Sequence, residues 1–190
     1  MFIYNLLKEV KPDEIYNLAA QSHVQHSFKM PSHTMDVNSN GVLNICQAIL
    51  LLDLKEKTRI FHASTSEMFG ELKEKGDKIL IDEDYPFNPM SPYAASKISA
   101  YYILKFFKNV HNFHICTTYG FNHESPLRHE EFVTRKITKA VARIKEGLQS
   151  KLMIGNIYAM RDWGHAKDFV RAYWVILTSG LKDDFVVSTE

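Results

Sequence analysis

Apolar residues along the chain occur in two patterns, helical spacing and short continuous runs. Helical spacing predicts helices at 2–10, from Ser32 or Thr34 to Asp53, from Ser91 to about Val110, from about residue 131 to Gly147, and at 165–178. Short apolar runs predict strands at 14–20, 58–64, 113–118, 151–155 and 184–188, with a turn or short strand at 161–164. Polar, turn-rich segments predict loops after residue 20, at 71–89 and at 119–130. Strands that alternate with helices predict an α/β fold built on a parallel sheet.

The helix expected from Ser91 carries candidate chemistry. Ser91 is a good capping residue, and Pro92 suits the first helical position. Tyr93 and Lys97 then lie on one helix face, about 6 Å apart along the axis. A nearby ammonium favours the phenolate and lowers the pKa of a tyrosine, which is about 10 in a free side chain. Such a pair can handle protons, although the same spacing also fits two ordinary surface residues.

Two predicted strands are followed by turns whose residues suit ligand binding. The stretch "HASTSEMFG" at 62–70 offers hydroxyls and a carboxylate, at Ser64, Thr65, Ser66 and Glu67. The stretch "NLAAQSHV" at 17–24 contains the small residues Ala19 and Ala20, which let the backbone approach a flat ligand. In open α/β sheets, ligands bind beyond the carboxyl ends of the strands. Each turn by itself also fits a plain capping or small-residue turn.

Length and composition narrow the class of protein. With 190 residues and 45% hydrophobic content, the chain suffices for one globular domain and part of a second. Charge is balanced, with 23 Lys and Arg against 22 Asp and Glu, so no basic excess indicates a nucleic-acid partner. Cys46 and Cys116 lie in apolar patterns, which predicts buried free thiols and a reducing compartment. The nine histidines show no metal-ligand spacing, and His23 and His26 fall in an expected loop, so no metal site is predicted.

No segment of the sequence predicts membrane insertion or export. The longest apolar run, around residues 48–52, is much shorter than the ~18–20 residues that a membrane span needs. The first residues lack the positive charge and the cleavage site of a signal peptide. We therefore expect a soluble protein of the cytoplasm.

The order of these features resembles that of the extended short-chain dehydrogenase/reductases. Two longer stretches, "FNHESPLRHEEFVTRKI" (121–137) and "RDWGHAKDFV" (161–170), narrow the resemblance. Together with "YNLAAQSHV" and "STSEMFG", they resemble the GDP-mannose 4,6-dehydratase family over almost the whole chain. The resemblance implies a Rossmann-like parallel sheet in a partial NAD(P)-binding domain over 1–190. Within it, residues about 120–165 would contribute to nucleotide-sugar binding.

The resemblance also implies roles in converting GDP-mannose to GDP-4-keto-6-deoxymannose with bound NADP, a step of GDP-fucose synthesis. Tyr93 would accept the proton of the C4 hydroxyl, and Lys97 would tune Tyr93 and bind the nicotinamide ribose. Glu67 would remove the C5 proton and help water leave from C6, and Thr65 would hydrogen-bond the sugar O4. Cofactor contacts are implied for Leu18, Ala19, Ala20, Gln21, Ser22, Lys97, His123 and Arg128. Contacts to GDP are implied for Asn122, Val133, Lys136 and Arg161.

The sequence departs from the family pattern in several places. The family begins with a strand and a Gly-x-x-Gly-x-x-Gly turn that holds the cofactor pyrophosphate. None of the eight glycines here lies before Gly41, and none has that spacing. We therefore expect a fold truncated in its N-terminal half and also short of most of the C-terminal domain, with the strand at 14–20 at a free sheet edge. His33 replaces a tyrosine that the family usually has near the cofactor, and Leu127 replaces the first of two arginines that contact a neighbouring subunit.

Three functions stay open. The first is a GDP-mannose 4,6-dehydratase that is a homo-oligomer in its complete form, favoured by the joint presence of Thr65, Glu67, Tyr93 and Lys97. The second is a non-catalytic truncated product that associates with full-length subunits, favoured by the missing glycine turn. The third is another sugar-nucleotide dehydratase or epimerase of the same fold, disfavoured because an epimerase would not need the Glu67 base. We expect the chain alone to be inactive or nearly so.

Overall fold

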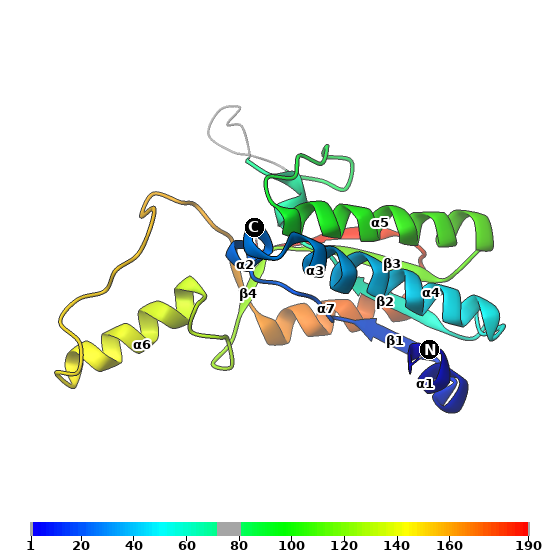
Figure 1. Cartoon of the computed structure of the whole chain (residues 1–190), viewed down its shortest axis with the longest axis horizontal. Coiled ribbons are helices and arrows are strands. Elements are labelled where there is room, and N and C mark those ends of the chain that lie inside the picture. Colours follow the sequence, from blue (N-terminus) through cyan, green and yellow to red (C-terminus); the bar gives the residue numbers. More distant parts are fainter. Residues whose placement is uncertain (1, 72–80, 190) are drawn as a thin grey trace.

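The computed structural model describes residues 2–71 and 81–189, which form a parallel sheet with helices on both faces (Figure 1). The strands of the main sheet are β1 (Glu14–Asn17), β2 (Arg59–Ala63), β3 (Ile115–Gly120) and β6 (Asp184–Val187), in the order β1-β2-β3-β6. Each neighbouring pair is parallel. A second sheet pairs β4 (Asn122–Glu124) with β5 (Trp163–His165). The expected α/β fold is confirmed.

Helices connect the strands. They are α1 (Phe2–Val10), α2 (Val24–Lys29), α3 (Pro31–Met35), α4 (Gly41–Leu51), α5 (Pro92–His111), α6 (Val133–Lys145) and α7 (Ala166–Thr178). Two short turns are added, the π-helical η1 (Asp36–Asn40) and the 3-10 turn η2 (Ser66–Phe69). Helices α4 and α5 pack together beside the sheet, and α7 contacts β2 and β3 (Figure 1). Figure 1 also shows α6 standing apart from the main sheet.

The side chains of β2 and β3 alternate between two apolar cores, because successive strand residues point to opposite faces. Ile60 and Ile115 pack with buried residues of α1, α4 and α5. Phe61 and Cys116 pack with buried residues of α7. All residues of β3 are buried, as expected for a strand with neighbours on both sides. Cys116 is a buried free thiol, as is Cys46, which confirms the prediction for both cysteines.

Helix α5 begins where its sequence predicts. The Ser91 hydroxyl oxygen accepts a hydrogen bond from the Ala94 N–H at 3.0 Å, and Pro92 occupies the first helical turn. The helix ends at Asn112, which adopts the left-handed conformation with φ 58°. The cap fixes the first turn of α5 and therefore fixes where Tyr93 stands relative to the sheet.

Three expectations for the first half of the chain need correction. The strand at 14–20 ends at Asn17, because the chain turns at once and the Leu18 N–H bonds the Tyr16 carbonyl at 3.1 Å. The expected loop after residue 20 contains α2, so His26 lies on a helix that His23 caps through its side chain. The long helix expected up to Asp53 is present but is divided into α3, η1 and α4.

The second half differs in smaller ways. The expected loop at 119–130 contains β4, which pairs with β5 at the possible strand of 161–164. No strand forms at 151–155, because this exposed segment meets no sheet edge within the described residues. In the expected loop at 71–89, residues 72–80 lie outside the described residues, and 81–89 form no helix or strand.

The two edge strands of the main sheet are β1 and β6, each with one neighbour in the described part of the chain. β1 pairs only with β2 there, so its expected place at a sheet edge is confirmed. Unpaired strand edges offer N–H and C=O groups to another strand. Among the described helices, none is long and apolar enough to cross a membrane.

Candidate active site

The carboxyl ends of β1, β2 and β3 lie at one edge of the sheet, because these strands are parallel and adjacent. The turns at 17–24 and 62–70 leave the sheet at this edge. Helix α5 contacts η2, which forms part of the second turn. The structure thereby brings the predicted residues Thr65, Glu67, Tyr93 and Lys97 to the same edge.

Tyr93 is the centre of this cluster and is only 8% exposed. Burial raises the pKa of its phenol to about 12, although the nearby Thr65 side chain acts to lower it. The negative charge of Glu67 raises this pKa further, and the positive charge of Arg128 lowers it. The phenol is therefore neutral at pH 7 in this structure, and Thr65 and Glu67 are close enough to act on it.

The effect of Lys97 on Tyr93 stays a prediction, since Lys97 is not among the groups that shift the pKa of Tyr93 in this structure. Its Nζ instead donates to the Ala63 carbonyl oxygen at 2.8 Å. Lys97 is 3% exposed, and burial lowers the pKa of its ammonium to about 8. An ammonium has three N–H donors, so two stay available for a bound hydroxyl group beyond the Ala63 carbonyl.

A buried histidine that the sequence did not single out lies beside Lys97. The Asn17 amide Nδ2 donates to His62 Nδ1 at 3.1 Å, so the neutral ring carries its proton on Nε2. Burial and the charge of Lys97 hold the pKa of His62 well below its usual range. His62 Nε2 finds no hydrogen-bond partner in the described part of the chain. In the sequence, Asn17 and His62 were indicated only by their position near the carboxyl ends of two predicted strands, which are adjacent in the sheet.

The turn after β2 is rigidly anchored. Thr65 caps η2, since its hydroxyl oxygen accepts the Glu67 N–H at 3.3 Å. Met68 and Phe69 are buried below the turn. Gly70 ends it with φ 70°, and a Cβ at this position would collide with the Asn88 carbonyl. This anchoring holds the Glu67 carboxylate near Tyr93.

The turn after β1 is held by its own side chains. The Gln21 side chain accepts the His23 N–H at 2.7 Å and donates to the Thr34 hydroxyl at 3.0 Å. Asn38 bonds both backbone groups of Gln21 and donates to the Ser96 hydroxyl oxygen at 2.8 Å. The buried Asn38 lies in η1, so the π turn coincides with this link between the loop and α5. The Gln21 side chain therefore positions the loop, while Leu18 and Ala19 face solvent.

His123 and Arg128 reach the same region from the segment after β3. His123 Nδ1 donates to the Phe121 carbonyl at 2.8 Å, and the ring stacks on Phe169 with centroids 4.6 Å apart. Arg128 Nε lies 3.2 Å from a Glu124 carboxylate oxygen. Its guanidinium also lies 3.6 Å from the centre of the Phe132 ring, a cation–π contact. These contacts hold the Arg128 charge close enough to influence Tyr93.

The residues implied for GDP binding are more dispersed. Asn122 belongs to β4, whereas Val133 and Lys136 lie on α6. Lys136 lines a cavity of about 290 Å³ whose other cations are Lys139, Arg143 and Lys151. Arg161 is exposed and donates to the neighbouring Met160 carbonyl at 2.6 Å. Since α6 stands apart from the sheet, this cavity lies away from the Tyr93 cluster (Figure 1).

Two hydroxyl groups beside Tyr93 were not predicted. Burial raises the pKa of Tyr173 on α7 to about 12, while the nearby Thr118 hydroxyl acts to lower it and Tyr93 to raise it. Thr118 Oγ1 itself has no hydrogen-bond partner among the described residues. A Cβ on Gly120 would lie 3.1 Å from the Tyr173 hydroxyl oxygen, so a larger residue there would press on this group. Tyr173 falls in an apolar helical stripe, and the sequence pattern therefore marked it only as core.

Two departures from the family pattern face solvent. Leu127 is 94% exposed, which is unusual for a large apolar side chain. His33 is an exposed residue of α3. Neither residue makes a side-chain contact to the Tyr93 cluster in the described part of the chain.

Solved structures with the same arrangement define the class of this protein. RMD from Pseudomonas aeruginosa, complexed with NADPH, matches with a TM-score of 0.85 and 27% identity, over 93% of this chain and 60% of that one. DesIV, a dTDP-glucose 4,6-dehydratase from Streptomyces venezuelae solved with NAD and TYD, matches with a TM-score of 0.81 and 25% identity. The match covers 97% of this chain and 55% of DesIV. The fold is that of an extended short-chain dehydrogenase/reductase.

Sequence comparisons give the family. The family model described as GDP-mannose 4,6 dehydratase matches residues 1–190. GDP-mannose 4,6-dehydratase of Vibrio cholerae is 48% identical over 184 residues, 97% of this chain and 48% of that protein. GDP-mannose 4,6 dehydratase 1 of Arabidopsis thaliana is 47% identical over 186 residues, which are 97% of this chain and 50% of that protein. The chain belongs to the GDP-mannose 4,6 dehydratase family, and it spans about half the length of the curated relatives it matches.

Proposed function

We propose that this protein takes part in GDP-mannose 4,6-dehydration, the conversion of GDP-mannose to GDP-4-keto-6-deoxymannose and water. The observation that carries the proposal is the cluster at the edge of the sheet, in which Thr65 and Glu67 lie close enough to Tyr93 to shift the pKa of its phenol. Lys97 completes it from the next turn of α5. Membership of the family supports the choice of substrate. An epimerase has no need of the Glu67 carboxylate, which disfavours that alternative.

The residues at this edge fit a nicotinamide dinucleotide, for which NADP is our proposal. Lys97 is buried and has N–H donors beyond the one that the Ala63 carbonyl takes, as a ribose hydroxyl would require. The small residues Ala19 and Ala20 leave the turn after β1 open to a flat ring. We propose that the backbone from Leu18 to Ser22, together with Lys97, His123 and Arg128, holds this cofactor. When bound, it would take a hydride from C4 of the sugar and return it at C6.

The chain's own residues would move the protons. We propose that the Thr65 hydroxyl binds the sugar O4 and that Tyr93 takes the proton of this hydroxyl. Because burial raises the pKa of Tyr93, the phenolate needs positive charge nearby, which Arg128 already contributes. The ketone formed at C4 makes the C5–H bond acidic, and Glu67 would take this proton. The C6 hydroxyl then leaves as water, and C5 is protonated again afterwards.

For the substrate diphosphate, we propose Lys136 and Arg161, with Asn122 and Val133 beside them. Cations pair strongly with phosphate oxygens, and Arg161 is exposed with a guanidinium that bonds only a neighbouring carbonyl among the described residues. In the cavity on α6, Glu130 pairs with Lys139 and Arg143 and offsets part of their charge. Lys136 and Lys151 have no ion-pair partner among the described residues, and they are the cations that favour an anion there.

We also propose that the protein forms homo-oligomers. Helix α5 exposes Tyr102 and Phe106, which together with Leu43 of α4 line an apolar groove of about 540 Å³. Exposed apolar surfaces of this kind commonly mark protein–protein contacts. A second copy that presents the same aromatic face would cover this groove by two-fold symmetry.

One observation favours the second candidate function, a non-catalytic partner of longer subunits. The 190 residues contain no glycine-rich turn that could cradle a pyrophosphate. A turn of this kind supplies several backbone N–H donors to the phosphates, and their loss weakens the hold on the cofactor.

NADPH titration tests both candidates. We expect the protein at its natural length to bind NADPH saturably, with enhanced nicotinamide fluorescence, and to bind NADH more weakly. The 190-residue polypeptide should bind NADPH far more weakly because it has no glycine-rich turn. Saturable micromolar binding by the 190-residue polypeptide would reject the non-catalytic candidate. Failure of the natural-length protein to bind NADPH would reject the dehydratase proposal.

A further inference from the structure

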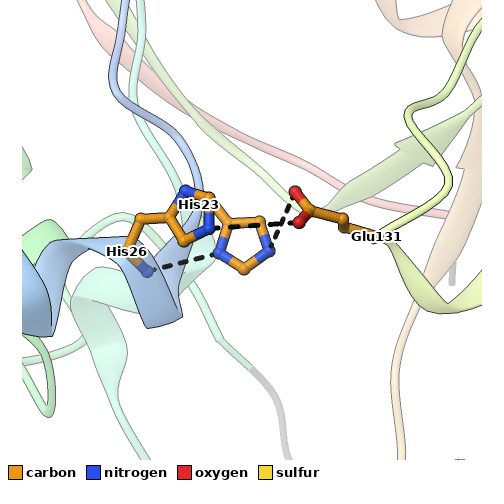
Figure 2. Close-up of side chains that lie close together, drawn as sticks. All are labelled: His23, His26 and Glu131. Carbon is orange, nitrogen blue, oxygen red and sulfur yellow. Dashed lines mark hydrogen bonds and ion pairs between the residues drawn. The ribbon is translucent and has the colours of Figure 1, made fainter.

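Three potential metal ligands meet outside the Tyr93 cluster. His23 caps α2, His26 lies in the first turn of α2, and Glu131 precedes α6. Their ligand atoms all lie within 4.8 Å of one another, although more than a hundred residues separate Glu131 from the histidines in the sequence. Figure 2 shows both imidazole rings directed at the Glu131 carboxylate. Among the described residues, this is the one such group of histidine, cysteine and acidic side chains.

The distances are close to those of a coordination sphere. His23 Nε2 lies 3.8 Å from one Glu131 carboxylate oxygen, and His26 Nε2 lies 4.0 Å from the other. Zn²⁺ holds nitrogen and oxygen ligands at about 2.0–2.2 Å, which places tetrahedral ligand atoms about 3.4 Å apart. The two rings are stacked, with centroids 4.1 Å apart and an angle of 26°, and they must turn out of this stack because a metal lies in the plane of each imidazole that binds it. The side chains are 24%, 44% and 48% exposed, so they can make this rotation without disturbing the core.

The tautomer of His23 sets the cost of binding. The His26 N–H donates to His23 Nδ1 at 3.3 Å, so a neutral His23 ring carries its proton on Nε2. A metal on Nε2 moves that proton to Nδ1 and breaks this long hydrogen bond. The bond is long and neutral, so its loss is a small cost beside that of forming metal–ligand bonds.

A third histidine, His129, lies nearby, but its nearest nitrogen is not available as a metal ligand. His129 Nδ1 lies 3.6 Å from the Glu131 carboxylate but accepts the Glu131 N–H at 3.4 Å. The lone pair of this nitrogen is therefore already used. The site consists of two imidazoles and one carboxylate, which leaves a coordination position for water.

We propose that His23, His26 and Glu131 bind one divalent transition-metal ion such as Zn²⁺. Two imidazole ligands favour Zn²⁺ and its first-row neighbours, whereas Mg²⁺ and Ca²⁺ prefer oxygen ligands throughout. The proposal depends on these three side chains alone and not on the dehydratase function.

The ion would tie α2 to the segment that leads into α6. This segment already contacts the same place, since the Phe132 and His23 ring centroids lie 5.6 Å apart. A metal bridge would restrict the separation of α6 from the sheet. Amide hydrogens of the residues around Glu131 and in α2 should then exchange more slowly when the ion is bound.

Titration of the tag-free protein with Zn²⁺, and with Co²⁺ as a coloured probe, tests the proposal. We expect one ion per chain, visible Co²⁺ absorption of a site below six-coordinate, and slower exchange at α2 and Glu131. His26→Gln and Glu131→Gln should each weaken Zn²⁺ binding by about tenfold or more. His33→Gln removes an exposed histidine of α3 and should leave the affinity unchanged.

The variants should change metal binding without changing the fold. All three changed side chains are outside the buried core, so circular dichroism and thermal unfolding should match those of the parent protein. Unchanged Zn²⁺ affinity in both His26→Gln and Glu131→Gln would overturn the proposal. An equal loss in His33→Gln would overturn it as well, since binding would then be spread over surface histidines.

Discussion

Tyr93→Phe should lower the turnover of GDP-mannose by about 10²–10⁴-fold in the protein expressed at its natural length, because it removes one proton-transfer group. The substitution deletes only the phenol oxygen, whose pKa is shifted by the nearby Thr65 and Glu67 side chains. The ring itself is buried and can stay in place. Binding of GDP-mannose should change little, so the loss should fall on kcat rather than on KM. The measurement is the rate of product formation at saturating substrate.

A second tyrosine of the same helix provides the control. Tyr102 is 58% exposed on α5, and Tyr102→Phe keeps the ring that lines the proposed oligomer groove, so this variant should keep the parent turnover. Thermal unfolding of both variants should stay within a few degrees of the parent protein. Near-normal turnover of Tyr93→Phe would show that the proposed catalytic assignment is incorrect.

Lys97→Met should stabilise the fold while it abolishes activity. Burial lowers the pKa of Lys97 from 10.5 to about 8, so the buried ammonium costs about 3 kcal/mol at pH 7. Methionine fills similar space without charge, although the Ala63 carbonyl then loses its partner. We expect the free energy of unfolding at pH 7 to rise by about 1–3 kcal/mol. Function and stability would thus oppose each other at this residue.

The stabilisation expected from Lys97→Met should decrease as the pH rises. Between about pH 8 and 10.5 the unfolded chain holds the Lys97 proton and the folded chain does not, so the Lys97 term makes stability rise with pH there. Lys97→Met has no such pH-dependent contribution. The difference in free energy of unfolding between this variant and the parent protein should therefore shrink by about 2 kcal/mol between pH 7 and pH 9.5. Tyrosines and Cys46 titrate equally in both proteins, and their contributions cancel in the difference.

Urea unfolding at the two pH values measures the effect. Lys105→Met serves as the control, because Lys105 is an exposed lysine of the same helix and should change stability by only about 0.5 kcal/mol. Destabilisation of Lys97→Met by more than about 1 kcal/mol at pH 7, or an advantage independent of pH, would contradict the account.

Much of the fold follows from local pattern. The cap at Ser91, the apolar runs of β2, β3 and β6, and the periodicity of α1, α5 and α7 predict their elements closely. The segment at 151–155 has an apolar run as well, but a strand also needs a neighbour to pair with, and none is available among the described residues. The π turn was equally hidden, because it coincides with buried hydrogen bonds of Asn38 to the distant residues Gln21 and Ser96.

The candidate site was predictable only in part. Strand-end turns and the Tyr-x-x-x-Lys spacing located Thr65, Glu67, Tyr93 and Lys97, because parallel strands end at a common edge. The pKa values of these side chains could not be predicted from the same local patterns. Burial, which raises the pKa of Tyr93 and lowers that of Lys97, depends on packing from distant segments. Contacts across long sequence separations, such as Glu131 with His23, leave no local signal at all.

The most direct test of the central claim is the product that the natural-length protein forms from GDP-mannose in D₂O, identified by mass spectrometry and NMR. Removal of the C5 proton by Glu67, loss of water and reprotonation from solvent predict GDP-4-keto-6-deoxymannose with a single deuterium at C5. Glu67→Gln should form little of this product. Unchanged GDP-mannose, or a product that keeps its C6 hydroxyl, would contradict the account.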